Sequence, residues 1–79
     1  MLGGDIVNNK AAKGLKVERI KKDLKVRDVA KKLGTSEQLI RRYESGNQRI
    51  SLEIIEKLLR IYGVDPKVFF ANICTNFYD

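Results

Sequence analysis

Apolar residues recur every three or four positions along most of the 79-residue chain, which is the spacing of one face of an α-helix. No segment shows the sustained alternation of β-branched residues that is typical of a strand. The pattern therefore predicts an all-α protein with five helices. Their expected bounds are Ala11 to Lys22, Val26 to Leu33, Glu37 to Ser45, Leu52 to Tyr62, and a last helix that opens at Pro66.

Residues that favour helix ends stand at these bounds. Glycine adopts the left-handed conformation after a helix without strain, and three of the predicted helices end in this way. The glycines are Gly34, Gly46 and Gly63. Ser36 and Ser51 are the expected N-caps of the third and fourth helices, because a serine hydroxyl accepts a hydrogen bond from a free backbone amide. Asp65 followed by Pro66 opens the fifth helix.

We expect residues 1–10 to form a polar, flexible N-terminal arm. Residues 11–79 are expected to form a single domain, in which Leu15 and Ile20 face inward from the first helix and residues 66–79 serve as a dimerisation segment. A domain of this size buries a marginal core, so association with a second copy would add stability.

The second and third helices are short and are joined by a short link, so they must cross steeply. Such a crossing needs a small residue at the contact, a residue that tolerates positive φ in the turn, and a large apolar residue on the second helix of the pair. Ala30, Gly34 and Ile40 meet these needs in that order. The rest of the expected inner face consists of Val29, Leu33 and Tyr43. This is the pattern of a helix-turn-helix.

The stretch from about Leu15 to Phe70 resembles the Cro/C1-type (XRE-like) helix-turn-helix transcriptional regulators, most clearly in "DVAKKLGTS" and "YESGNQRISLEIIEKLLRIYGVD". The resemblance implies a compact five-helix lambda-repressor-like DNA-binding domain, with the helix-turn-helix at helices 2 and 3. It also implies a partly buried ion pair between Arg19 of the first helix and Glu44 of "YESG". The alternative is that both side chains are solvated.

The chain departs from that family at three positions. Val26 stands where the family commonly has a glutamine that clamps a phosphate, and Lys25 stands where a capping serine or threonine is usual. Ile50 replaces a frequent proline. The start of the second helix is therefore weakly capped, and a phosphate contact there must rely on backbone N–H groups and on Lys25 or Arg27.

Side chains near the start of the third helix are the candidates for reading bases. By resemblance these are Glu37, Gln38, Arg41 and Arg42. Gln38 suits adenine, Arg42 suits guanine, and Glu37 accepts a hydrogen bond from cytosine. Simpler roles are also open. Glu37 is favoured in the first turn of any helix, Gln38 folds back in a capping box if Thr35 is the N-cap, and the two arginines touch phosphate only.

Polar residues that flank the reading helix are candidates for holding the DNA backbone. They are Lys25, Arg27, Ser36, Ser45, Asn47, Gln48 and Arg49. The alternative is an ordinary polar loop. Lysines of the first helix and the arm would add non-specific attraction to DNA; these are Lys10, Lys13 and Lys16.

The charge balance favours a polyanionic partner. Sixteen lysines and arginines stand against ten acidic residues, which gives a net charge of +6, as expected of a nucleic-acid-binding domain. The chain has no histidine and a single cysteine, Cys74, so we expect no disulfide, no metal site, no cofactor and no enzymatic activity. Without a long apolar run or an apolar leader, we expect a cytoplasmic protein that does not associate with membranes.

A single reading helix contacts few base pairs, so regulators of this kind bind as two-fold dimers across a palindrome. The segment "KVFFANICTNFY" carries more aromatic surface than one small domain buries. The expected isologous interface comprises Leu58, Phe69, Phe70, Ile73 and Phe77, with Tyr78 at its edge. The alternative is that Phe69 and Ile73 complete the core of the monomer.

Together these features predict a sequence-specific double-stranded DNA-binding transcriptional regulator that acts as a homodimer on a palindromic operator and controls its own gene. The stretches "SGNQRISLEIIEKL" and "VFF" are similar to restriction–modification controller proteins. An antitoxin-type protein-binding module and a phage repressor are the alternatives. RNA polymerase and a toxin are the candidate protein partners.

Overall fold

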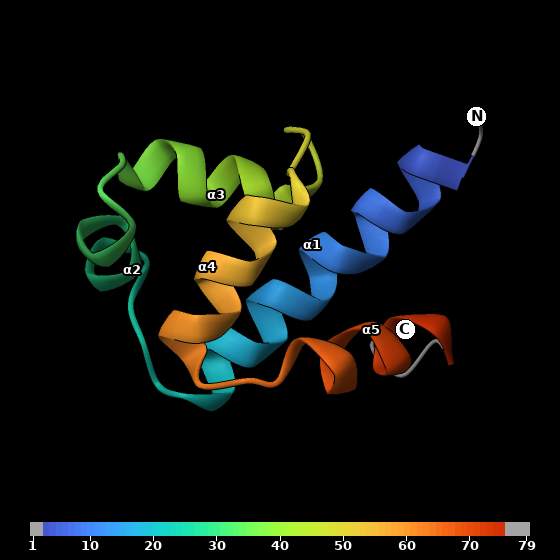
Figure 1. The fold of residues 1–79 in the computed structure, drawn as a ribbon. Coiled ribbons are helices and arrows are strands. Elements are labelled where there is room, and N and C mark those ends of the chain that lie inside the picture. The colour runs from blue at the N-terminus through green and yellow to red at the C-terminus, as the bar shows by residue number, and fades with distance from the viewer. Residues whose placement is uncertain (1–2, 76–79) are drawn as a thin grey trace.

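The computed structural model describes residues 3–75 of the chain, with side chains described from Asn9 onward. Five helices make up its regular secondary structure (Figure 1). They are α1 (Gly3–Lys21), α2 (Val26–Leu33), α3 (Glu37–Ser45), α4 (Leu52–Tyr62) and α5 (Pro66–Cys74). No strand occurs between residues 3 and 75, which confirms the all-α prediction and fits a lambda-repressor-like arrangement.

Three helices begin at their predicted residues because each has a side-chain N-cap. Ser36 and Ser51 each accept a hydrogen bond through Oγ from the amide three residues later, over 3.2 Å in both cases. Asp65 Oδ1 accepts one from the Lys67 amide over 2.9 Å. α2 also begins where predicted, and Lys25 before it makes no side-chain cap, as expected from its sequence.

The first helix is longer than the sequence indicates. It begins at Gly3 rather than Ala11, so the predicted boundary is wrong, and residues 3–10, expected to form an arm, are helical. Extending a formed helix by one residue costs far less than starting a helix. Within the extension, Asn9 lies beside the end of α3, since a Cβ at Gly46 would stand 2.7 Å from Asn9 Oδ1. This contact with another element supports a part of the helix that the sequence did not predict.

The orientation predicted for Ile20 is also wrong. Leu15 is fully buried, as expected, but Ile20 is 57% exposed. Five residues of α-helix correspond to a rotation of about 140° about the helix axis. The two side chains therefore lie on different faces of α1, and only the face of Leu15 meets the other helices.

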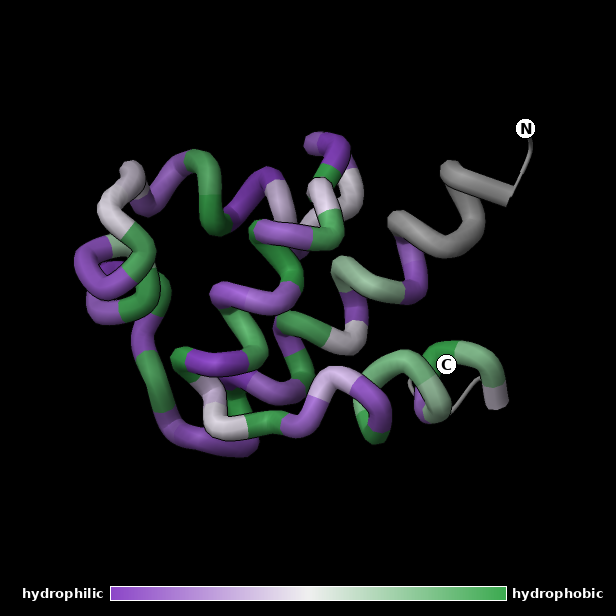
Figure 2. Tube along the Cα trace, in the orientation of Figure 1, coloured by the Kyte–Doolittle hydropathy of each residue, from purple (hydrophilic) through white to green (hydrophobic). Residues whose placement is uncertain are grey.

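All five helices contribute to one hydrophobic core. Its largest fully buried side chains are Leu15 of α1, Val29 of α2, Ile40 of α3, Leu58 and Leu59 of α4, and Phe69 of α5. Green hydrophobic and purple hydrophilic positions alternate along α2, α3 and α4 in Figure 2. α1 packs against α3, α4 and α5, while α2 packs against α3 and α4. The core thereby fixes α2 and α3 through their buried faces.

The core contains three residues that were expected at a dimer interface. Leu58, Phe69 and Ile73 are 1, 0 and 6% exposed within the single chain, so they are not available to a second copy and their assignment to that interface is wrong. The physical reason is that α5 packs against α1 and completes the monomer core. Phe70 is half-buried, with its ring centre 5.5 Å from that of Phe69 in an edge-to-face arrangement. Two residues of the expected interface lie outside the described part of the chain, Phe77 and Tyr78.

α2 and α3 meet through the residues that the motif requires. Gly34 has a φ of 80°, and its amide donates hydrogen bonds to the carbonyls of Ala30 and Lys31. The chain therefore turns there in the left-handed region, which glycine adopts without strain. Ala30 and Ile40 are both buried, and α2 packs against α3. The turn leaves the outer face of α3 open to solvent.

Candidate nucleic-acid interface

The four side chains predicted to read bases are all exposed on α3. They are Glu37, Gln38, Arg41 and Arg42. The opposite face of the helix buries Ile40 and Tyr43 in the core. α3 is therefore anchored on one side and polar on the other, which is the arrangement that lets a helix enter the major groove of DNA.

Glu37 and Arg41 already interact with each other. Arg41 Nη2 lies 3.5 Å from Glu37 Oε1, and both side chains are well exposed. An exposed pair one helical turn apart contributes about 0.3–0.5 kcal/mol. Because the pair is this weak, a base edge or a phosphate can displace either partner.

Gln38 is not part of the helix cap. Ser36, rather than Thr35, is the N-cap of α3, and its Oγ accepts a hydrogen bond from the Leu39 amide. A capping box between Thr35 and Gln38 is therefore excluded, which leaves the Gln38 amide group to face solvent. Ser36 accepts through Oγ in this cap, and a serine hydroxyl can donate at the same time.

An ion pair joins α3 to α1. Arg19 donates from Nε to Glu44 Oε2 over 2.7 Å and from Nη2 to Glu44 Oε1 over 3.0 Å. Its Nη1 donates to the Leu24 carbonyl over 2.8 Å. The two side chains are 13 and 6% exposed, so the partly buried pair that the resemblance implies is present. The hydrogen bond to Glu44 raises the pKa of the Arg19 guanidinium and outweighs the opposing effect of its burial.

A basic hollow opens at the start of α2. It has a volume of about 480 Å³ and is lined by Arg19, Lys25, Val26, Arg27, Glu37 and Arg41. α2 has no side-chain cap at this end, and the free amides and positive dipole of a helix start favour an anion. Lys25 and Arg27 thus meet Arg41 of α3 at a place suited to a phosphate group. Val26 is buried, so its side chain offers no polar contact in place of the family's glutamine.

A second hollow contains a lysine that was expected only to add non-specific attraction. Its volume is about 270 Å³, and it is lined by Lys16, Arg19, Val26, Arg41, Glu44 and Ser45. Lys16 precedes Arg19 by three positions, so both side chains stand on one side of α1. That spacing was the signal in the sequence that could have found it. Lys16 therefore belongs with the candidate phosphate contacts.

The polar residues at the end of α3 and directly after it differ in the hydrogen-bonding groups that they leave exposed. Ser45 Oγ donates a hydrogen bond to the Arg42 carbonyl over 3.0 Å and accepts one from the Asn47 amide over 3.4 Å. In this conformation Ser45 closes the end of α3 and does not present a free donor. Asn47 and Arg49 are exposed, and Gln48 is half-buried. Asn47 and Arg49 are thus the better placed of the expected backbone contacts in this loop.

Metal ligands do not gather in the part of the chain that the structure describes. Within it, no group of three His, Cys, Asp or Glu side chains lies close enough to hold a metal ion. No helix among the described residues is long and apolar enough to cross a membrane. Cys74 is exposed at the end of α5.

Comparison with known proteins identifies the fold and the class of protein. Residues 15–69 match the family described as helix-turn-helix. The chain is 43% identical over 51 residues to proteins described as HTH-type transcriptional regulatory proteins in Saccharolobus islandicus and Saccharolobus solfataricus. It is 39% identical over 58 residues to the transcriptional repressor RstR of the cryptic phage CTXphi of Vibrio cholerae. No solved structure matches the chain.

The matched region covers most of this chain but a smaller share of each relative. It spans 65% of the chain and 16% of each archaeal protein. For the phage repressor it spans 73% of the chain and 52% of the relative, about half its length. The match over residues 15–69 includes α2, the turn at Gly34 and α3. The chain therefore belongs to the Cro/C1-type helix-turn-helix family of DNA-binding transcriptional regulators.

Proposed function

We propose that this chain recognises a specific double-stranded DNA sequence by placing α3 in the major groove, and that it regulates transcription from that site. The observation that carries the proposal is the exposed polar face of α3 next to an uncapped, basic start of α2. The Arg19–Glu44 pair supports it, because two parallel hydrogen bonds fix the orientation of α3 against α1.

Base recognition rests on the start and centre of α3. Gln38 pairs with the N6 and N7 groups of an adenine, and Arg42 pairs with O6 and N7 of a guanine. The two residues are four positions apart, so they reach the same groove from one helix face. Glu37 accepts from a cytosine N4 once Arg41 turns away from it to a phosphate or a second base.

Backbone contacts surround this helix. Lys25, Arg27 and the first amides of α2 hold one phosphate, and Lys16 lies close enough to the same surface to add a second charge. Asn47 and Arg49 hold the backbone on the other side of α3. Ser36 and Gln48 add polar contacts at either end of the reading helix.

The protein acts as a homodimer on a palindromic operator, since one α3 reads too few base pairs to select a single site. The surface available for pairing is the outer side of α5, where Val68 is 54% exposed and Phe70 is half-buried. Phe77, outside the described residues, extends the same apolar segment along the sequence.

The regulated gene is the protein's own, and the protein works in the cytoplasm, where RNA polymerase meets the promoter. Similarity to a phage repressor favours repression as the direction of control. The narrower role of a restriction–modification controller rests on the resemblance of "SGNQRISLEIIEKL" and "VFF" alone. An antitoxin role would add a toxin as a bound protein.

Binding to the DNA upstream of its own gene, compared with a scrambled duplex by fluorescence anisotropy at two salt concentrations, tests the proposal. Preference for the upstream duplex by about a thousandfold or more is the expected result. The test variant is Gln38→Ala with Arg42→Ala, which should lose the preference, and the control is Lys22→Ala, an exposed position just after α1, which should keep it. Equal and steeply salt-dependent affinity for both duplexes would show that the protein binds DNA only through non-specific charge attraction.

A further inference from the structure

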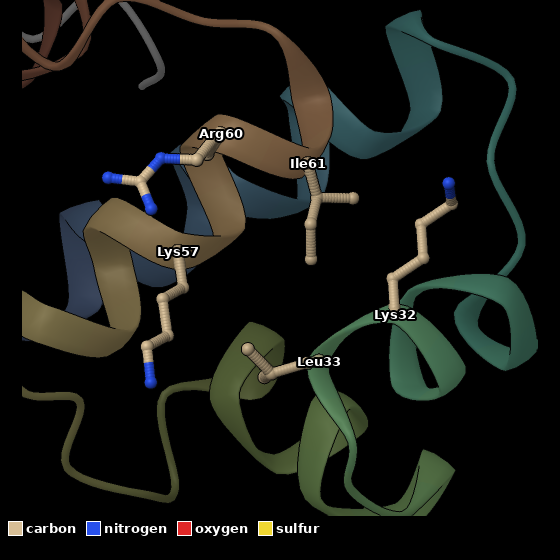
Figure 3. A pocket seen from close by; sticks show the side chains of 5 residues that line it. All are labelled: Lys32, Leu33, Lys57, Arg60 and Ile61. Carbon is tan, nitrogen blue, oxygen red and sulfur yellow. The ribbon is translucent and has the colours of Figure 1, made fainter.

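A hollow between α2 and α4 has no part in the proposed DNA contacts. It has a volume of about 560 Å³ and is lined by Lys32, Leu33, Lys57, Arg60 and Ile61 (Figure 3). Clefts that bind ligands in proteins commonly measure about 300–1,000 Å³. The hollow is therefore large enough to receive side chains from another molecule.

The lining combines two kinds of chemistry. Leu33 and Ile61 are half-buried aliphatic side chains that also pack against the core, and they lie between the three basic side chains in Figure 3. The basic side chains are all exposed; they are Lys32, Lys57 and Arg60. An occupant of this site must offer both negative charge and an apolar group.

Among the described residues, one of the three cations that line the hollow is ion-paired with an acidic side chain. Lys57 forms an exposed ion pair with Glu53, with Nζ 3.6 Å from Oε2. Among the described residues, neither Lys32 nor Arg60 forms an ion pair with an acidic side chain. Three cations around one concave surface attract anions to it and repel one another. A bound anionic group would relieve that repulsion.

The hollow is separate from the surface assigned to DNA. It shares no lining residue with either hollow beside α3. Lys32 stands at the end of α2, whereas Lys25 precedes its first residue, a separation of roughly 10 Å along the helix axis. The protein therefore has a second basic surface at the far end of the same short helix.

We propose that this hollow docks an acidic amphipathic segment of a partner protein. Its carboxylates pair with Lys32, Lys57 and Arg60, and one aliphatic or aromatic side chain covers Leu33 and Ile61. A DNA backbone supplies charge but no apolar side chain, so it would leave the aliphatic floor uncovered. Charge complementarity and the apolar floor together select a protein segment over a nucleic acid. This docking site does not depend on the DNA-binding proposal.

Selection from a peptide library tests the docking site even though the partner protein is unidentified. Random displayed peptides of about 12 residues, long enough to span such a groove, are selected on the full chain and counter-selected on the Lys32→Glu/Arg60→Glu variant. Lys22→Glu/Lys67→Glu is the matched control, because it makes the same change of charge at exposed positions elsewhere. Thermal melting checks that both variants fold.

The expected result has three parts. Enriched peptides carry acidic residues around a leucine, isoleucine or phenylalanine. They bind the wild type and the control variant alike and bind the Lys32→Glu/Arg60→Glu variant at least about tenfold more weakly. On the wild-type chain they shift the amide NMR signals of the five lining residues, a readout that does not depend on either variant folding.

Several results would overturn the proposal. One is failure to enrich any peptide over the bare support; another is enrichment of peptides without acidic or without apolar residues. Equal loss of binding in both variants would show general charge attraction, and NMR shifts elsewhere would assign a different surface. A fall in DNA affinity that is confined to the Lys32→Glu/Arg60→Glu variant would make the hollow a DNA-backbone contact instead.

Discussion

Replacing Glu44 with alanine should destabilise the fold far more than any exposed charge substitution. The change removes both oxygens that accept hydrogen bonds from Arg19, at 2.7 and 3.0 Å. It leaves a guanidinium that is 13% exposed with the Leu24 carbonyl as its remaining partner. Breaking one side of a buried pair costs about 3–5 kcal/mol. A chain of 79 residues has a total free energy of unfolding of roughly 4–12 kcal/mol, so the loss is a large share of it.

Urea denaturation followed by circular dichroism measures this free energy of unfolding directly. The matched control is Glu53→Ala, because Glu53 pairs with Lys57 over 3.6 Å with both side chains exposed. That change should cost less than about 0.5 kcal/mol. Replacing both partners of the buried pair, as Arg19→Met with Glu44→Leu, should recover most of the loss because no unpaired charge is left inside.

A Glu44→Ala variant no less stable than Glu53→Ala would refute this reasoning. The Arg19–Glu44 pair would then behave as a solvated surface pair despite its burial. The support that it lends to the orientation of α3 would have to be abandoned as well.

Three further predictions concern specificity, the core and association. Arg42→Ala should cost about 1–3 kcal/mol in DNA binding and relax specificity at one base pair; uniform weakening on every duplex in an anisotropy competition would assign Arg42 to phosphate. Tyr62→Phe should leave the free energy of unfolding at pH 7 unchanged or slightly raised in urea denaturation, because within the described structure the buried Tyr62 hydroxyl has no hydrogen-bond partner. Burial raises the pKa of Tyr62 above its ordinary value of 10.0, so the folded chain keeps a proton that the unfolded chain loses. The free energy of unfolding of the wild type should therefore fall by about 1.4 kcal/mol more than that of Tyr62→Phe for each pH unit above about 10. Parallel pH profiles of this free energy in the two proteins would contradict the prediction. Val68→Glu with Phe70→Glu should lower the sedimentation coefficient to that of a monomer, whereas an unchanged value would exclude the outer side of α5 as the dimer surface.

Local signals placed four of the five helix starts correctly. Ser36, Ser51 and Asp65 each accept the amide hydrogen of a residue two or three positions later, so the capping hydrogen bonds lie within a few residues of sequence. Gly34 likewise ends α2 through bonds to residues of the preceding turn. Such contacts can be read from the order of residues, because their partners are neighbours along the chain. The start of α1 was missed because the sequence around Gly3 carries no comparable capping signal.

The candidate site was partly accessible in the same way. The exposed face of α3 followed from helical periodicity, and the Arg19–Glu44 pair followed from resemblance to a family. The sequence did not assign Lys16 to the candidate site, because its position depends on how α1 packs against α3. In the structure Lys16 and Arg41 line the same hollow. Sequence also left open whether Thr35 or Ser36 caps α3, which geometry resolved in favour of Ser36.

Burial was the property that the residue order did not settle. Phe69 and Ile73 are equally apolar in a core or at a dimer interface, and they lie in the core because α5 packs against α1. The hollow between α2 and α4, which Lys32 and Arg60 line, likewise exists because these two helices pack together. The sequence was sufficient to predict most helix ends, the buried faces of the helices and the family. These features depend on interactions within a few residues or on recurrent motifs. Which apolar faces are covered and which charges meet depended on how distant helices pack, since burial is a property of contacts between segments and not of any one segment.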